Sequence, residues 1–265
     1  MIRLTLCADD FGHSPGTSAV IAELIETGRI NATSCMALSD GWERDGKLLR
    51  PLAEKAQLGL HLTLTDEAPL TAMPEFAAAG TMPAIDNLAR RNQWPRAEIA
   101  REIAAQFDRF EAVIGRPPDF VDGHQHVHHL PGIRDLVLAE TRRRAPTAWL
   151  RDCRDSALGI VSRPFVLKAI GSALRGRGFR AEARRSELAT NDGFAGHYDF
   201  GDHFALRFPT FLRRPGQHHV VMVHPGSDDR PGDTIGAARV REAAYLRATD
   251  TAALAVTCGL SLSRP

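Results

Sequence analysis

The chain has 265 residues, 43% of them hydrophobic and 25% charged, and its 33 Lys and Arg residues against 32 Asp and Glu residues leave a formal net charge of +1. This balance is typical of a globular protein and gives no reason to expect a nucleic-acid partner. Four widely spaced cysteines without a C-x-x-C pair suggest neither a thiolate zinc site nor a dense disulfide framework. No apolar stretch resembles a signal peptide or approaches the ~18 residues of a transmembrane segment, so we expect a cytoplasmic protein.

Strand and helix patterns alternate along the chain. Strands are predicted at residues 3–8, 33–38, 57–65, 120–123, 148–150, 218–224 and 252–258. Helices are predicted from Ser14-Pro15-Gly16 to Gly28, from the end of the second strand to Ala56, and at 96–114, 132–144 and 235–248. Such alternation is the pattern of an α/β protein with a parallel sheet and crossover helices.

The number of predicted strands favours one architecture. About seven parallel strands in a chain of this length suit a single closed or nearly closed (β/α) barrel better than an open doubly wound sheet. No G-x-G-x-x-G follows the first strand, which argues against a dinucleotide cofactor. We therefore expect one domain over residues 1–265, with a long loop at about 66–95 where barrel enzymes build loops over their sites.

Two adjacent carboxylates, Asp9 and Asp10, follow the first predicted strand in the segment Ala-Asp-Asp-Phe-Gly. The C-terminal exit of a strand allows adjacent side chains to turn into one pocket, and two like charges side by side require a cation or a shared proton. The alternative is an Asp-rich turn or a helix N-cap, and the pair alone does not decide between these interpretations.

His61 lies within the third predicted strand. Strand alternation places Leu58, Leu60 and Leu62 on the face that packs against helices, and it places His61 on the opposite, small and polar face. In a barrel that second face is the interior, so a histidine near the C-terminal end of the strand would point into the site. A hydrogen-bonded structural histidine is the alternative.

Further histidines gather at two other strand ends. The segment 122–129, Asp-Gly-His-Gln-His-Val-His-His, contains His124, His126 and His128, which share one face if the chain stays extended there. His224 ends an apolar strand before Pro-Gly. Imidazole is the commonest nitrogen ligand for zinc, and the alternatives are a surface tract, an adventitious metal binder or a histidine that simply ends a strand. Because every cluster lies at the C-terminal end of a strand, we expect the clusters to meet in one site.

At these residues the sequence resembles the YdjC-like carbohydrate deacetylases, a group that includes chitooligosaccharide deacetylase and the hopanoid-associated HpnK proteins. The shared segments are Ala-Asp-Asp-Phe-Gly at 8–12, Gly-Leu-His-Leu at 59–62, Asp-Gly-His-Gln-His-Val-His at 122–128 and His-Pro-Gly at 224–226, in the order and spacing of the family. The resemblance covers most of the chain and implies a distorted (β/α) barrel that removes acetyl groups from N-acetylated sugars.

The resemblance also implies roles for individual residues. It makes Asp10, His61 and His124 the ligands of one divalent metal ion, with Asp9 as catalytic base and His224 as catalytic acid. It extends less directly to Arg151, which would be a site arginine at the end of another strand. It leaves His126 and His128 as substrate contacts or supporting residues, and His128 could replace or support His124 as a ligand.

These residues fit hydrolysis of an acetyl amide at a metal ion, with zinc or magnesium expected and no nucleotide cofactor. The alternatives are a catalytically inactive metal- or sugar-binding barrel and a non-haem iron enzyme that uses the same Asp/His/His set. The expected partner is an N-acetylated sugar, as a small glycan or a lipid-linked sugar, and the family suggests a homodimer. The basic segment 168–185 is interpreted as solvated surface, with an anionic or membrane-linked substrate as the alternative.

Overall fold

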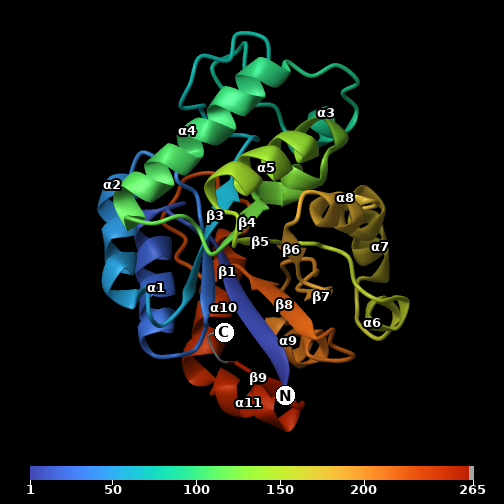
Figure 1. Cartoon of the computed structure of the whole chain (residues 1–265). Coiled ribbons are helices and arrows are strands. Elements are labelled where there is room, and N and C mark those ends of the chain that lie inside the picture. The colour runs from blue at the N-terminus through green and yellow to red at the C-terminus, as the bar shows by residue number, and fades with distance from the viewer. Residues whose placement is uncertain (263–265) are drawn as a thin grey trace.

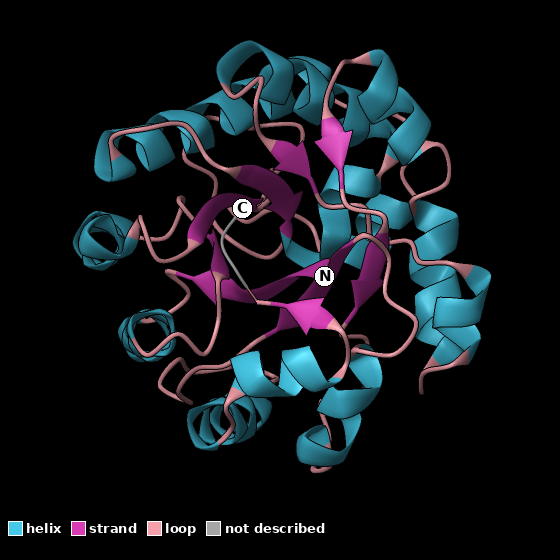
Figure 2. Cartoon of the chain, turned by 60° about the horizontal axis from the view of Figure 1, so that its bottom comes forward, coloured by secondary structure: helices cyan, strands magenta, loops and turns pink. Residues whose placement is uncertain are grey.

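A curled parallel β-sheet surrounded by helices makes up residues 1–262, which the computed structural model describes (Figures 1 and 2). The strands are β1 (Ile2–Phe11), β2 (Ala32–Cys35), β3 (Gln57–Leu62), β4 (Phe120–Gly123), β5 (Trp149–Leu150), β6 (Ala189–Thr190), β7 (Gly193–Ala195), β8 (His218–Val223) and β9 (Leu260–Ser261). Their order is β6-β5-β4-β3-β2-β1-β8-β7, with β9 beside β1. All of these pairings are parallel, which confirms the predicted α/β class.

The strands form a ring with helices on its outside (Figure 2). The helices are α1 (Pro15–Glu26), α2 (Trp42–Asp45), α3 (Ile85–Ala89), α4 (Arg96–Ile114), α5 (Pro131–Arg144), α6 (Ala157–Val161), α7 (Val166–Arg175), α8 (Phe179–Arg185), α9 (Phe204–Phe211), α10 (Gly236–Ala248) and α11 (Thr251–Thr257), with 3-10 helices η1 (Gly46–Leu52) and η2 (His124–His129). Within residues 1–262, no helix combines the length and the hydropathy needed to cross a membrane.

The ring is interrupted between its end strands, β6 and β7, which form no ladder with each other in the described part of the chain. The side chain of Asn191 lies at this gap. Its Oδ1 accepts from the backbone N–H of Asp152 at 2.6 Å, and its Nδ2 donates to the carbonyl oxygens of Asp152 and Gly193 at 2.9 and 3.0 Å. A side-chain amide thus replaces ladder hydrogen bonds, and the result is the expected distorted barrel.

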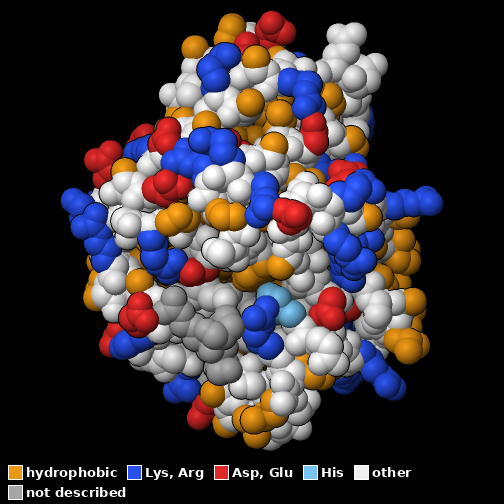
Figure 3. Space-filling model, viewed as in Figure 1, with side chains coloured by type: hydrophobic (Ala, Val, Ile, Leu, Met, Phe, Trp, Pro, Cys, Tyr) orange, Lys and Arg blue, Asp and Glu red, His pale blue; other side chains and the backbone are white. Residues whose placement is uncertain are grey.

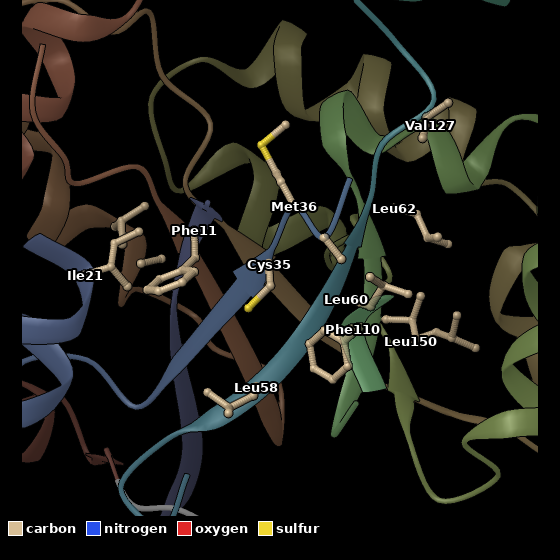
Figure 4. Close-up of a cluster of buried hydrophobic side chains, with 14 of the residues drawn as sticks. Phe11, Ile21, Cys35, Met36, Leu58, Leu60, Leu62, Phe110, Val127 and Leu150 are labelled. Carbon is tan, nitrogen blue, oxygen red and sulfur yellow. The ribbon is translucent and has the colours of Figure 1, made fainter. Parts of the chain in front are cut away.

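Strand alternation separates two apolar layers. Leu58, Leu60 and Leu62 of β3 belong to the large cluster between the sheet and the helices, part of which is drawn in Figure 4. The smaller cluster includes Cys7, Ala32, Phe120, Trp149, Phe194, Val220 and Met222, which fill the inside of the barrel. Because successive side chains point to opposite faces, β3 contributes leucines to the outer layer and His61 to the inside.

One predicted element is wrong in type. Residues 252–258 were expected to form a strand, but Thr251–Thr257 is the helix α11 and the strand β9 comes after it. The side chain of Asp250 accepts from the backbone N–H of Ala253 at 3.0 Å and caps the helix. A short apolar run has no periodicity that distinguishes a strand from a buried helix, so the capping aspartate is the better signal.

Gly59 gives a test of packing inside the barrel. A Cβ atom there would lie 2.3 Å from the Phe120 ring, so Gly59→Ala is expected to lower the free energy of unfolding by about 1–3 kcal/mol, as overpacking does. Gly171→Ala is the matched control, because a Cβ on this helical glycine meets nothing within 4 Å. Urea unfolding of both variants checks the prediction, and equal stability of the two would contradict the packing around Phe120.

His219 in β8 gives a test of pH-dependent stability. Burial lowers its pKa to about 4, and its Nε2 lies 2.9 Å from the carbonyl oxygen of Phe211. Because the folded state keeps this imidazole neutral while the unfolded chain is protonated below about pH 6.5, the stability it gives is complete above that pH and is lost toward pH 4. We expect His219→Gln to make urea unfolding less sensitive to pH between about pH 7 and pH 5, and identical slopes would contradict this account.

Candidate metal centre and active site

A cavity of about 1090 Å³ opens at the C-terminal ends of the barrel strands. Besides His126, its lining includes the five residues expected as metal ligands or catalytic groups: Asp9, Asp10, His61, His124 and His224. They come from β1, β3, the start of η2 and the end of β8. The structure therefore brings together side chains that are far apart in the chain, at the end of a barrel where active sites form.

A backbone irregularity lets two adjacent aspartates face this cavity. In a regular strand Asp9 and Asp10 would point to opposite faces. The register between β1 and β2 shifts between Ala8 and Phe11, and Asp10 has a left-handed φ of 66°. Such bulges turn side chains next to active sites, and the left-handed backbone is costly for a residue other than glycine. Both carboxylates consequently line one pocket.

Asp10, His61 and His124 form the centre of the site. The Oδ1 atom of Asp10 lies 3.3 Å from Nε2 of His61 and 3.2 Å from Nδ1 of His124. One ligand atom from each of these residues lies within 4.8 Å of the other two. Burial alone would raise the pKa of Asp10, but Arg239 and the two histidines hold it well below its usual value. The three side chains converge as an ionised carboxylate with two imidazoles.

The ring of His61 is held from behind by Asp122 and Ser34. Its Nδ1 lies 2.7 Å from Oδ1 of Asp122 and 3.0 Å from Oγ of Ser34, and the Ser34 hydroxyl also donates to that carboxylate oxygen. A carboxylate that accepts from Nδ1 leaves Nε2 directed toward Asp10, the arrangement typical of metal-binding histidines. Burial opposes charge on this ring, yet Asp122 and Asp10 raise its pKa to about 10. The same negative field favours a metal cation.

Arg151 connects Asp9 with Asp122, the carboxylate that holds His61. The guanidinium is fully buried and donates to both oxygens of Asp9 at 2.6 Å, and its NH2 atom also lies 2.6 Å from Oδ2 of Asp122. A planar guanidinium fixes a carboxylate through two parallel hydrogen bonds, so Asp9 has one orientation. The sequence suggested a site arginine here, and the structure places it directly against Asp9.

Arg239 of α10 holds the other oxygen of Asp10. Its NH2 atom donates to Oδ2 of Asp10 at 2.8 Å, and its Nε donates to Asp233 at 2.6 Å. The connected network contains four carboxylates, those of Asp9, Asp10, Asp122 and Asp233, and the guanidinium groups of Arg151 and Arg239. The raised pKa of His61 gives this network one further positive charge, so one buried carboxylate remains in excess, which is costly without a cation. A divalent ion between Asp10, His61 and His124 would compensate that charge, so these residues fit a metal site.

His224 lies at another part of the cavity wall. Its backbone N–H donates to Oε2 of Glu242 at 2.6 Å, and its ring packs edge-on against Phe200 at 5.3 Å. The buried Nδ1 atom has no hydrogen-bond partner within the described residues. Burial lowers the pKa of His224 to about 4 against the opposing effect of Asp10 and Asp9. The ring is therefore neutral at rest.

The histidine tract after β4 is not extended, so the prediction of a shared face is wrong. Gln125 and His126 have left-handed φ values of 51° and 60°, which turn the chain through η2. His124 consequently faces Asp10, and His126 lines the cavity 5.8 Å from the rings of Phe194 and His197. His128 is buried behind the site, with Nε2 2.8 Å from the carbonyl oxygen of Arg151. The structure does not bring His128 to Asp10.

Several residues of the site were not singled out from the sequence. Asp122 stands in the segment 122–128 and pairs with His61 across β3 and β4, so the strand register is the signal that could have identified it. Ser34 lies on the neighbouring strand β2. No local signal marks Arg239, which lies 229 residues from Asp10 on the helix α10.

Solved structures share this fold. A protein from Enterococcus faecalis V583, whose description proposes cellobiose-phosphate cleavage, is 22% identical with a TM-score of 0.76, covering 99% of this chain and 97% of that one. The Bc1960 peptidoglycan N-acetylglucosamine deacetylase is 11% identical with a TM-score of 0.51, covering 98% of this chain and 84% of that one. At these identities the likeness concerns the fold.

Sequence comparison identifies nearer relatives. A protein of Enterobacter sp. (strain 638) named chitooligosaccharide deacetylase is 36% identical over 142 residues, which are 53% of this chain and 56% of that protein. One of the same name from Citrobacter koseri is 33% identical over 167 residues, 63% of this chain and 65% of that protein. The matched segments thus span less than two thirds of either relative. The YdjC-like protein family matches residues 3–256, and the chain belongs to that family.

Proposed function

We propose that the protein is a metal-dependent hydrolase that removes the acetyl group from an N-acetylated sugar or oligosaccharide. The observation that carries this proposal is the convergence of Asp10 Oδ1 with one nitrogen each of His61 and His124 in the wall of the cavity. Membership of the YdjC-like family and the name chitooligosaccharide deacetylase of two relatives support the choice of substrate class.

One divalent ion, zinc or magnesium, would be held by Asp10, His61 and His124, and would polarise the acetyl carbonyl and lower the pKa of a water molecule. One carboxylate and two imidazoles leave coordination positions open, as a catalytic site requires. Two nitrogen ligands and one oxygen ligand favour zinc over magnesium.

Asp9 is the proposed base. Its carboxylate lines the cavity beside Asp10, and Arg151 fixes its orientation through hydrogen bonds to both oxygens. Each of these oxygens keeps a further lone pair, with which it would accept a proton from the attacking water molecule. Arg151 acts through Asp9 and is a positioning residue.

His224 is the proposed acid. An amine anion is a poor leaving group, so the sugar nitrogen must gain a proton when its bond to the acetyl carbon breaks. Because burial lowers the pKa of His224 to about 4, the ring is neutral at rest, so it would first take up the proton that Asp9 accepts from the attacking water molecule and then pass it to the sugar nitrogen. The residue lines the cavity, and its Nδ1 has no hydrogen-bond partner among the described residues.

Replacing His224 by alanine tests this role. We expect the variant to keep its metal and to lose about 10²–10⁴ in kcat on an N-acetylhexosamine glycan, the usual share of general acid catalysis. The loss should be smaller on an N-acetyl arylamine, because an aromatic amine leaves more easily. Steady-state kinetics on both substrates measures the difference, and an equal loss on both would contradict the assignment.

The reaction itself is tested by product analysis. The protein is incubated with metal alone and a panel of chitooligosaccharides, N-acetylglucosamine and lipid-linked N-acetyl sugars, and acetate and free amine are both quantified. We expect equal amounts of the two products from at least one substrate. A requirement for NAD, ATP or 2-oxoglutarate would contradict the proposal, and sugar binding without acetate release would identify an inactive barrel.

A further inference from the structure

Exposed apolar side chains gather on the helices beside the cavity. Of ten large apolar residues that are exposed in the described chain, six lie on the helices α6, α7 and α9. They are Leu158, Val161, Leu167, Ile170, Leu174 and Leu206, and we call them the apolar face. Leu167 and Leu206 are 85% and 73% exposed, which is unusual for leucine. A cluster of this kind marks an interaction surface.

Helix α7 turns its apolar side toward solvent, whereas an ordinary surface helix turns that side toward the core. Leu167, Ile170 and Leu174 are spaced three and four residues apart, so they share one side of the helix, and all three face solvent. The opposite side carries Ala169 and the buried Ser172 toward the protein. The amphipathic pattern is therefore strong but directed outward, and the described residues provide nothing that covers it.

The three helices are neighbours. Helix α6 packs against α7. The guanidinium of Arg207 in α9 lies 5.5 Å from the ring centroid of Phe165, the residue that precedes α7, so α9 is adjacent as well. Apolar atoms lie along the right-hand edge of the space-filling view in Figure 3, where Figure 1 places α6 and α7.

Positive charge accompanies the apolar face. Residues 156–185 contain seven basic residues and a single acidic one, Glu182, which pairs with Arg134. Two of the seven are also paired, Arg163 with Asp155 and Arg180 with Asp152. Arg175, Arg177 and Arg213 are exposed and have no carboxylate within ion-pair distance among the described residues. Arg175 and Arg177 closely follow the exposed Leu174 at the end of α7, so positive charge adjoins the apolar face.

The apolar face also reaches the active-site cavity. Leu167, Lys168, Gly171 and Arg175 of α7 all belong to the lining of that cavity. Leu167 is thus part of both surfaces. A partner that covers the apolar face would lie at the entrance of the cavity.

We propose that the apolar face docks the protein on an anionic lipid bilayer, with its leucines at the boundary between headgroups and acyl chains and its arginines at lipid phosphates. Outward apolar residues flanked by cations are the features of a helix that lies in a membrane interface. A second copy of the chain fits less well, because a symmetric contact would bring two segments of the same positive charge together. Docking of this kind would direct the cavity toward the membrane surface, and it does not depend on the reaction proposed above.

Vesicle flotation with the full chain tests the docking. The vesicles are phosphatidylcholine alone or phosphatidylcholine mixed with phosphatidylglycerol. We expect the protein to bind the anionic vesicles. Binding should be weaker on neutral vesicles, and binding to anionic vesicles should weaken in high salt. Leu167→Ser with Leu174→Ser should lower the partition coefficient between water and vesicles at least about tenfold, because two leucine side chains no longer move from water into the bilayer. Arg177→Gln with Arg213→Gln should lower it about fivefold for each cation removed.

The control carries the same kind of change elsewhere. Lys47→Gln with Leu48→Ser removes one exposed cation and one exposed leucine from η1 and should leave vesicle binding unchanged. The arginine variant preserves the test if the leucine variant fails to fold, which circular dichroism would reveal. No binding to anionic vesicles, or an equal loss in the control, would overturn the proposal. A dimer in vesicle-free buffer that the leucine substitutions dissociate would also overturn it, since the face would then bind a second copy.

Discussion

Replacing His61 or His124 by alanine is expected to remove bound metal and acetate release together. Each substitution removes one of the three ligands. Loss of a residue that only hydrogen-bonds a ligand commonly lowers metal affinity about 10–100-fold, so loss of the ligand itself should lower it at least about 100-fold. Excess metal should partly restore the rate, because Asp10 and the remaining histidine stay in place. Metal analysis of the purified variants beside kinetics at several metal concentrations measures both effects.

A histidine outside the site serves as the control for these variants. His203 is exposed and does not line the cavity, so His203→Ala should keep both metal and activity. Because His61 also pairs with the buried Asp122, thermal unfolding of His61→Ala should be measured to separate metal loss from a general loss of structure. Full metal content in either ligand variant would show that the ion binds elsewhere.

Asp9→Asn is expected to keep the metal and to lower kcat by about 10²–10⁴. Asparagine has nearly the shape of aspartate but cannot accept the proton of the attacking water molecule. The ligands of the metal are other residues, and Arg151 retains its ion pair with Asp122 at 2.6 Å, so the architecture of the site should persist. Metal content near that of the wild type together with the low kcat would support the assignment.

The adjacent aspartate provides the matched comparison. Asp10→Asn removes the ligand oxygen that lies 3.3 Å from His61 and 3.2 Å from His124, so it should lose metal as well as activity. If Asp9→Asn emptied the site while Asp10→Asn kept metal and most of its activity, the roles of the two residues would be reversed.

Local patterns in the sequence predicted much of the fold. The helix Arg96–Ile114 and the strand Phe120–Gly123 have the expected bounds, because an amphipathic period and flanking turn residues define both. The position of His61 inside the barrel follows from alternation along β3. The histidine tract was misjudged because its turn depends on left-handed backbone at Gln125 and His126, for which no glycine gives a signal.

Contacts between residues far apart in the sequence could not be predicted from such local patterns. Arg239 reaches Asp10 only through the packing of α10, which contacts α1 and α9, and nothing in its own segment distinguishes it from a surface arginine. The unusual exposure of Leu167 is also a tertiary fact, since an amphipathic helix in sequence is expected to bury its apolar side. Residues whose roles depend on contacts with distant parts of the chain can be identified only from the structure.

A metal titration tests the central claim most directly. The wild-type protein is stripped with a chelator, dialysed and loaded stepwise with zinc or magnesium, and acetate release from an N-acetylated chitooligosaccharide is measured beside bound metal at every step. The account predicts that the stripped protein releases no acetate and that the rate rises in proportion to bound metal until each chain holds a single ion. Full acetate release by the stripped protein would contradict it.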